Sequence, residues 1–271
     1  MIRTPLRLYR PESVAEATAL LDEHGDNAAV LGGGTLLVPA LGRGERSVTA
    51  LIDLGALGLD GITRENDELV VGARATYSRV AESRLCRQHA PLLAEVATRI
   101  TGGAQLRNQA TYGGSACYAN PSSDAPAVLV ALQARLVAAG TNGSRVIDAS
   151  AFFTGAFATA LAPGELVTHI HVPTADAPYA YEKVKHCEGS WPIVTCTATT
   201  TAAGRRAITL GGVCTTPVEV DDADGGDLTD RIVAALQEPW SDALADGSYR
   251  AAVAPALARR VLDRLDLGAT R

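Results

Sequence analysis

The stretch Thr101–Asp124 reads TGGAQLRNQATYGGSACYANPSSD and decides how the rest of the chain is interpreted. It is rich in Gly, Thr, Ser and Asn, has no apolar periodicity, and lies between two helical patterns. A loop of this length inside a compact domain usually has a function. Its glycines permit positive φ and close approach of the backbone to a ligand, and its hydroxyls add polarity without bulk. The stretch therefore predicts a phosphate-binding loop.

A second loop of the same chemical kind lies earlier, at Leu31–Gly44, with the sequence LGGGTLLVPALGRG. It follows a short apolar run, and its three consecutive glycines precede Thr35. Backbone N–H groups in such a turn can point at one anion. Two loops of this kind predict a cradle that holds a pyrophosphate from two sides.

Composition limits the classes of protein that the chain can belong to. Its 271 residues, 47% of them hydrophobic, suffice for one large domain or two smaller ones. With 24 Lys and Arg against 30 Asp and Glu, and a net charge of -6, it shows no basic surface for nucleic acid. We find no signal-peptide pattern and no apolar run long enough for a membrane span, and we expect a cytoplasmic protein.

Cysteine and histidine spacing gives no metal signature. The five cysteines are odd in number and form no C-x-x-C pair, which argues against a disulfide framework or an iron–sulfur cluster on this chain. His169 and His171 share one face of a predicted strand, but no third ligand accompanies them, and we expect ordinary strand residues.

Periodicity and turn residues predict the elements of the first part of the chain. A helix after Ser13 has a capping box with Glu16 and ends at Gly25. The other predicted helices are Thr76–Ser83, Pro91–Ile100, Ala125–Ala134 and Ala151–Phe157; the predicted strands are Ala28–Leu31, Val48–Leu54, Glu68–Ala73, Arg135–Gly140, Ser144–Ala149 and Glu165–Pro173.

A change of pattern follows the segment TADAP, which is the best candidate for a domain boundary. From Tyr179 onward come three consecutive strands rich in β-branched residues, then the acidic segment DDADGGD and two helical stretches. Strands followed by helices predict a smaller α+β layer.

Ordered motifs along nearly the whole chain resemble the FAD-binding medium subunits of molybdenum hydroxylases, the group that includes carbon monoxide dehydrogenase and xanthine dehydrogenase. The first family motif, A-G-G-T/H-D/S-L, is matched by Gly32–Leu37. The second, I-G-x-x-Q-I-R-N-x-G-T-x-G-G-N/D-x-x-x-A-x-P-x-S-D, is matched in order across Thr101–Asp124. Further similarities include Ile52–Asp53–Leu54 and a C-terminal signature at Tyr249–Arg250.

The resemblance implies an α+β fold. A two-lobed FAD-binding domain of the p-cresol methylhydroxylase type is expected at residues 1–174, with lobes at about 1–55 and 56–174. A small C-terminal α+β domain of the carbon monoxide dehydrogenase flavoprotein type is expected at residues 175–271.

It also implies FAD as the cofactor, with both glycine loops at its pyrophosphate, and no catalytic side chain and no metal ligand on this chain. Asp124 is expected to accept hydrogen bonds from ribityl or ribose hydroxyls, although it could also cap the next helix. The expected cofactor-binding residues are Leu31, Gly32, Gly33, Gly34, Thr35, Leu36, Leu37, Thr101, Thr111, Tyr112, Gly113, Gly114, Ser115, Asp124, Leu166 and Lys183.

Three departures from the family pattern concern the polarity of the site. Leu36 stands where Asp or Ser is usual, Ser115 where Asn or Asp is usual, and Cys187 where Arg is common before Trp191. They bear on flavin affinity and on the exposed face of the flavin, and not on the fold.

The function that the resemblance implies is electron transfer in a hetero-oligomeric dehydrogenase. A large molybdenum-cofactor subunit and a small [2Fe-2S] subunit are the expected partners, and the flavin would pass electrons to an external acceptor. Two alternatives stay open: an oxidoreductase that acts alone on a small molecule with its own FAD, and a flavin-free scaffold or binding protein.

Overall fold

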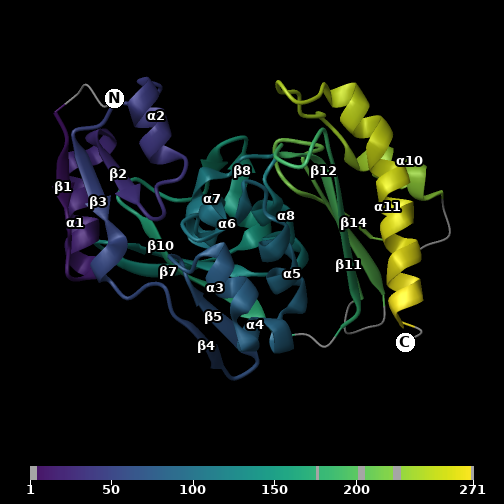
Figure 1. The fold of residues 1–271 in the computed structure, drawn as a ribbon, viewed down its shortest axis with the longest axis horizontal. Helices are drawn as coiled ribbons and strands as arrows, with labels where there is room; N and C mark the ends of the chain where they lie inside the picture. The colour runs from purple at the N-terminus through teal and green to yellow at the C-terminus, as the bar shows by residue number, and fades with distance from the viewer. Residues whose placement is uncertain (1–4, 175–176, 201–204, 222–226, 270–271) are drawn as a thin grey trace.

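The computed structural model describes residues 5–174, 177–200, 205–221 and 227–269 and contains three sheet-based parts side by side (Figure 1). The N-terminal part is a parallel sheet in the order β1-β3-β2, built from Arg7–Tyr9, Ala50–Asp53 and Ala28–Leu31. Helix α1 (Val14–His24) buries Ala17 and Leu21 against it, and a second helix, α2 (Leu37–Arg43), follows the first glycine turn.

The predicted start and end of α1 are confirmed. The Ser13 side chain accepts a hydrogen bond from the Glu16 N–H at 3.1 Å, and Gly25 follows the last helical residue with φ 50°. The Glu16 carboxylate reaches back to the N–H of Glu12 at 2.8 Å. One orphan N–H group of this helix start and the N–H group just before the cap are therefore satisfied.

The central part is a five-stranded antiparallel sheet in the order β4-β5-β10-β6-β7. Its hairpin around Asn142–Gly143 confirms the predicted turn. Strand β4 was not predicted, because three of its four residues are exposed and no apolar alternation marks it. The strands are β4 (Ile62–Glu65), β5 (Glu68–Gly72), β6 (Arg135–Gly140), β7 (Gly143–Asp148) and β10 (Leu166–Pro173).

Helices on this sheet form the largest hydrophobic core of the described residues. Thr76 and Ser83 cap α3 and α4 through their side chains. The helices of the core are α3 (Tyr77–Glu82), α4 (Arg84–His89), α5 (Pro91–Arg99) and α8 (Asp124–Ala131).

The interpretation of Thr101–Asp124 as a continuous loop is wrong, because it contains helices α6 (Gly103–Arg107) and α7 (Tyr112–Tyr118). The α7 helix buries Tyr112, Gly113 and Ala116, so its packed face consists largely of small residues that carry little hydrophobic signal. Thr111 caps it by accepting a hydrogen bond from the Gly114 N–H at 3.1 Å.

The predicted helix Ala151–Phe157 is also wrong over most of its length. Helix α9 (Ala149–Phe152) ends at Phe152, one residue after the start of the predicted helix. The chain then continues as β8 (Phe153–Gly155), which pairs with β9 (Ala158–Thr159). Neighbouring residues on a helix project about 100° apart. The extended backbone at Phe153 instead allows both phenylalanine rings to be buried edge to face, 5.3 Å apart.

The C-terminal part is a four-stranded antiparallel meander covered by two helices, which confirms the predicted run of strands before helices. Helices α5 and α8 lie on one face of this sheet and α11 on the other (Figure 1). The elements are β11 (Tyr179–Lys185), β12 (Pro192–Thr200), β13 (Arg206–Gly211), β14 (Val218–Asp221), α10 (Leu228–Ala235) and α11 (Gly247–Ala269).

The fold is thus α+β, with the two-lobed arrangement and the small C-terminal domain of the predicted fold class. The predicted domain limits at residues 55 and 174 remain predictions. Parts of TADAP and DDADGGD lie outside the described residues. Within the described ranges, no helix combines the length and apolar character needed to cross a membrane.

Candidate functional site

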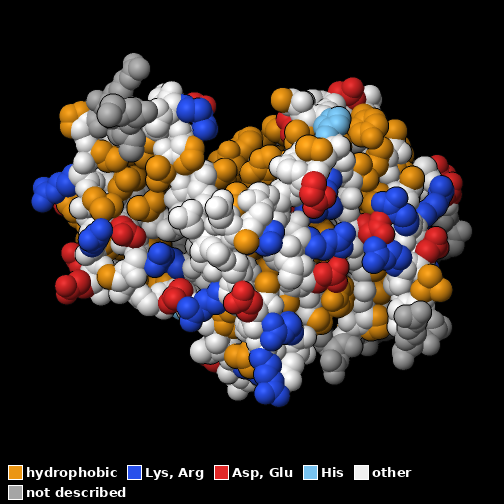
Figure 2. Space-filling model, viewed as in Figure 1, with side chains coloured by type: hydrophobic (Ala, Val, Ile, Leu, Met, Phe, Trp, Pro, Cys, Tyr) orange, Lys and Arg blue, Asp and Glu red, His pale blue; other side chains and the backbone are white. Residues whose placement is uncertain are grey.

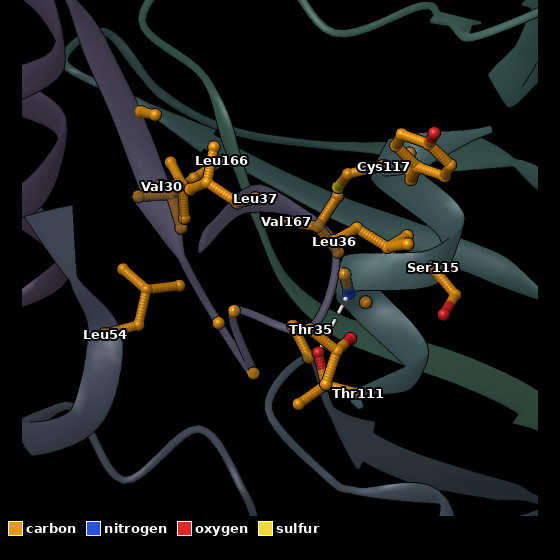
Figure 3. A pocket seen from close by; sticks show the side chains of 18 of the residues that line it. Val30, Thr35, Leu36, Leu37, Leu54, Thr111, Ser115, Cys117, Leu166 and Val167 are labelled. Carbon is orange, nitrogen blue, oxygen red and sulfur yellow. Dashed lines mark hydrogen bonds between the residues drawn. The ribbon is translucent and has the colours of Figure 1, made fainter. Parts of the chain in front are cut away.

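A cleft of about 560 Å³ lies between the N-terminal sheet and the central part, and both glycine turns line it. Figure 2 shows the molecule indented between these parts, with hydrophobic side chains along the hollow. Thr35 and Thr111 project from the two turns into the same region (Figure 3). The two segments that the sequence predicted to act together therefore meet at one cavity.

Different elements line the two ends of the cleft. Apolar side chains from β2, η2 (Leu54–Ala56) and β10 line one end, and Figure 3 shows Val30, Leu54 and Leu166 there. Ser115 and Cys117 on α7 line the other end. An elongated ligand with a polar centre and one flat apolar end fits such a cleft.

The first turn supplies free backbone donors at the middle of the cleft. Gly34 has φ 71°, and the N–H groups of residues 33–36 have no hydrogen-bond partner in the described part of the chain. The first helical bond beyond them runs from the Val38 N–H to the Gly34 carbonyl at 3.0 Å. Consecutive unpaired N–H groups are the backbone arrangement that binds a phosphate oxygen.

In the second turn, the backbone N–H groups are already hydrogen-bonded to other protein groups. Tyr112 and Gly113 donate to the carbonyls of Ala75 and Ala73 at 3.1 and 3.0 Å, and the Gly114 N–H is taken by Thr111. This turn therefore offers the cleft a side wall with hydroxyl groups, and the backbone donors come from the first turn.

The glycines also allow the turns to touch each other. A Cβ atom on Gly33 would lie 1.9 Å from the Gln109 carbonyl oxygen, and one on Gly113 would lie 2.6 Å from Ala73 Cβ. Both distances are much shorter than a van der Waals contact between non-bonded atoms. The sequence predicted close approach of the backbone to a ligand, whereas at these positions the structure shows close approach of backbone to protein.

Charged side chains also line the cleft. Arg43 is paired with Glu45 through two hydrogen bonds of 2.6 and 2.8 Å. Glu165 is paired with Arg145, and this contact lowers the pKa of the Glu165 carboxyl. Arg46 and Arg74 also line the cleft. Isolated arginines outside a recognised motif gave no signal in the sequence.

Asp124 and Lys183 lie outside the cleft lining, in a buried cluster between the central part and β11. The Asp124 carboxylate accepts hydrogen bonds from Lys183 Nζ at 2.8 Å and from the Tyr181 hydroxyl. Lys183 also donates to the Arg99 carbonyl at 2.7 Å. Burial, together with the Asp124 charge, raises the pKa of Tyr181 and keeps this hydroxyl a donor.

Three other expected site residues also lie outside the lining. Tyr112 is buried beneath it, donates to the Leu93 carbonyl at 2.9 Å and packs edge to face against Tyr77. Leu31 precedes the first turn and Thr101 precedes Gly102 at the start of α6. The expected residues that line the cleft are Gly32, Gly33, Gly34, Thr35, Leu36, Leu37, Thr111, Gly113, Gly114, Ser115 and Leu166.

The described residues contain no group of three or more His, Cys, Asp or Glu side chains placed to hold a metal ion. His171 Nδ1 lies 3.2 Å from the Glu68 carboxylate on the neighbouring strand. The chemistry of the cleft is instead that of a dinucleotide site, with unpaired backbone donors at its centre and an apolar end.

Comparison with known proteins agrees with this geometry. Residues 4–175 match the family model described as the FAD binding domain in molybdopterin dehydrogenase. The carbon monoxide dehydrogenase medium chain of Afipia carboxidovorans is 31% identical over 97% of this chain and 98% of its own length. The glyceraldehyde dehydrogenase medium chain of Sulfolobus acidocaldarius is 36% identical over 68% of this chain and 66% of its own.

A solved structure shares the fold over the full length. Reconstituted CO dehydrogenase from Oligotropha carboxidovorans contains a chain that is 31% identical, covers 99% of this chain and 100% of that one, and superposes with a TM-score of 0.91. The similarity therefore includes the C-terminal meander and its helices as well as the cleft.

Proposed function

The chain belongs to the family of FAD-binding medium subunits of molybdenum hydroxylases, and from this premise we propose that it carries electrons from iron–sulfur clusters on a partner chain to an external acceptor. FAD is its cofactor, and the chain is the flavoprotein subunit of an oxidoreductase. When bound, FAD supplies the redox chemistry, and the protein supplies binding, orientation and electrostatics.

The observation that carries the proposal is the meeting of the two glycine turns in one cleft. In our assignment the free N–H groups of residues 33–36 bind the pyrophosphate, and Thr111 and Ser115 face it from the other side. Leu166 belongs to the apolar end, where a flat ring system is excluded from water. No side chain is assigned a catalytic role.

Contacts of the cofactor with the remaining family positions stay predictions. Asp124 and Lys183 satisfy each other in the structure, so contact with FAD requires the cofactor to share or replace one of these hydrogen bonds. Leu31, Thr101 and Tyr112 adjoin the turns in sequence and can act on the cofactor through the backbone.

The partners in this proposal are a large molybdenum-cofactor subunit and a small [2Fe-2S] subunit. The support comes from the relatives, whose names describe them as medium chains or subunits of dehydrogenases. The acceptor is external to the complex.

Purification of the chain from its native source, followed by flavin, iron and molybdenum analysis, tests the proposal. We expect two companion polypeptides, one FAD per copy of this chain, and both metals in the same fraction. A yellow chain that elutes alone and is bleached by a small-molecule substrate under anaerobic conditions would show instead an enzyme that acts by itself. A colourless chain that takes up no added FAD would contradict the cofactor assignment.

A further inference from the structure

Three arginines line the FAD cleft, and their surroundings differ. Arg43 is held by Glu45 in a two-pronged ion pair, so its charge is largely matched within the chain. Arg46 is exposed and follows Gly44, which ends α2. A seven-residue helix is roughly 10 Å long. Arg46 therefore follows the end of this helix that is farther from the glycine turn.

Arg74 lies next to the second glycine turn. Its neighbour Ala73 packs closely against Gly113: a Cβ atom added to Gly113 would lie 2.6 Å from Ala73 Cβ. The peptide group that precedes the arginine is fixed, because the Arg74 N–H donates to the Leu59 carbonyl at 2.7 Å and the Ala73 carbonyl accepts from the Gly113 N–H. The side chain therefore leaves a rigid segment at the base of the cleft.

The guanidinium of Arg74 is partly satisfied by the protein. Nη1 donates to the Gly55 carbonyl at 3.2 Å, which orients the group. Nε is buried and has no hydrogen-bond partner in the described part of the chain. A buried N–H without a partner is costly, so this guanidinium keeps donor capacity that the protein does not satisfy.

The first turn places an apolar side chain, that of Leu36, in the lining of the cleft. Its apolar side chain cannot orient a phosphate by hydrogen bonding. The Arg74 guanidinium lines the same cleft and can supply donors to a phosphate, because its planar fork matches two phosphate oxygens at once.

We propose that the Arg74 guanidinium binds the diphosphate of FAD in this chain while Nη1 stays on the Gly55 carbonyl. This inference deepens the proposed function and rests on it. It assigns a charge-matching role to a residue that belongs to neither glycine motif. No bond is made or broken.

Binding to the purified full-length apo chain tests the assignment with three probes: FAD, ADP, which has the diphosphate without the flavin, and riboflavin, which has the flavin without phosphate. For Arg74→Ala we expect dissociation constants for FAD and ADP that are at least about tenfold higher, and an unchanged value for riboflavin. The salt dependence of FAD binding should become shallower, since one screened charge contact is lost. Arg74→Lys should give intermediate affinity, because it keeps the charge and loses the planar fork.

Arg64→Ala is the matched control. Arg64 also makes one side-chain hydrogen bond to a backbone carbonyl, that of Asn66 at 3.2 Å, but it is exposed and does not line the cleft. We expect its affinity for all three probes to equal that of the wild type. Circular dichroism melts of each apo variant verify that folding is retained.

Unchanged FAD and ADP affinity in a folded Arg74→Ala variant would overturn the inference, and so would equal weakening of riboflavin. Failure of the proposed site itself gives a different result. In that case bulky residues at Gly33 and Gly114 would leave FAD binding intact, whatever Arg74 does.

Discussion

Gly33 shows how one residue decides whether the two turns can form one site. Its backbone lies against the carbonyl of Gln109, and even a methyl group would overlap that oxygen at 1.9 Å. Gln109 lies two residues before Thr111, which caps α7. Any side chain at Gly33 must therefore separate the first turn from the start of α7.

We expect Gly33→Ala to lower the free energy of unfolding by about 1–3 kcal/mol and to weaken FAD binding strongly, because the added methyl group overpacks the turn contact. Urea unfolding and FAD titration measure the two effects. Gly42→Ala is the control, since a Cβ on that helical glycine meets nothing within 4 Å. If both variants bind FAD like the wild type, the two turns do not need their contact.

Asp124 shows what the motif alone could not reveal. The sequence placed this residue at the end of the second family motif, but its side chain is directed by Tyr181 and Lys183, which lie far along the chain. Its position at the start of α8 could be predicted from local pattern. Its buried partners could not, because they depend on how β11 packs against that helix.

Lys183→Met should destabilise the chain by about 3–5 kcal/mol, because it leaves the Asp124 carboxylate buried without its counter-charge. Chemical denaturation of the apo chain measures this loss. Lys185→Met, two residues along the same strand, removes an ion pair with an exposed glutamate and should cost about 1 kcal/mol or less. Equal effects of the two substitutions would show that burial of the first pair is unimportant.

At the scale of elements, Arg250 joins the start of α11 to the sheet and to the segment before α8. Its side chain is fully buried and donates to the Gly212 carbonyl at 2.9 Å and to the Asp242 carboxylate at 2.5 Å. Asp242 in turn accepts from the Ser122 hydroxyl at 2.9 Å. Burial opposes ionisation of Asp242, but the Leu244 N–H, Ser122 and the Arg250 charge outweigh it and lower the pKa of this carboxyl.

This lowered pKa predicts a defined pH dependence. Because the folded state holds the ionised form, its contribution to stability is complete above the ordinary value of 3.8 and is lost as the pH falls through the lower folded value. We expect Asp242→Asn to have a lower Tm at neutral pH and a flatter Tm profile between about pH 5 and 2 than the wild type. Thermal melts of both proteins across that pH range measure the difference. Parallel Tm profiles would show that Asp242 does not contribute to the pH dependence of stability.

Elements with strong local signals were predictable, and those with weak ones were not. The α1 helix has a capping residue, an apolar stripe and a terminal glycine, and its limits follow from them. The α7 helix has an equally good cap at Thr111 but a packed face of small residues, so its glycines were taken as loop residues. The cleft-lining turns were recognised through motif order, whereas Arg74 belongs to no motif and depends on tertiary contacts.

At the scale of the whole molecule, the C-terminal part is held against the central part by side-chain packing and by buried polar contacts. Helix α8 lies so close to β13 that a Cβ on Gly211 would come within 2.7 Å of Ala127 Cβ. Asp124 and Ser122, both at the start of this helix, bond to Lys183 and Asp242 in the C-terminal part. The two parts therefore share one stabilising interface.

We expect the full chain to unfold in a single calorimetric transition, because separating the parts would expose apolar helix faces and leave buried charges unpaired. A fragment of residues 1–174 should melt at a lower temperature than the full chain and bind a hydrophobic dye, since α5 and α8 lose the sheet that covers them. Differential scanning calorimetry and dye fluorescence on both proteins provide the comparison, with Lys183→Met in the full chain as an intermediate case. Two resolved transitions in the full chain, or a fragment as stable as the whole, would show that the interface contributes little and that the parts fold independently.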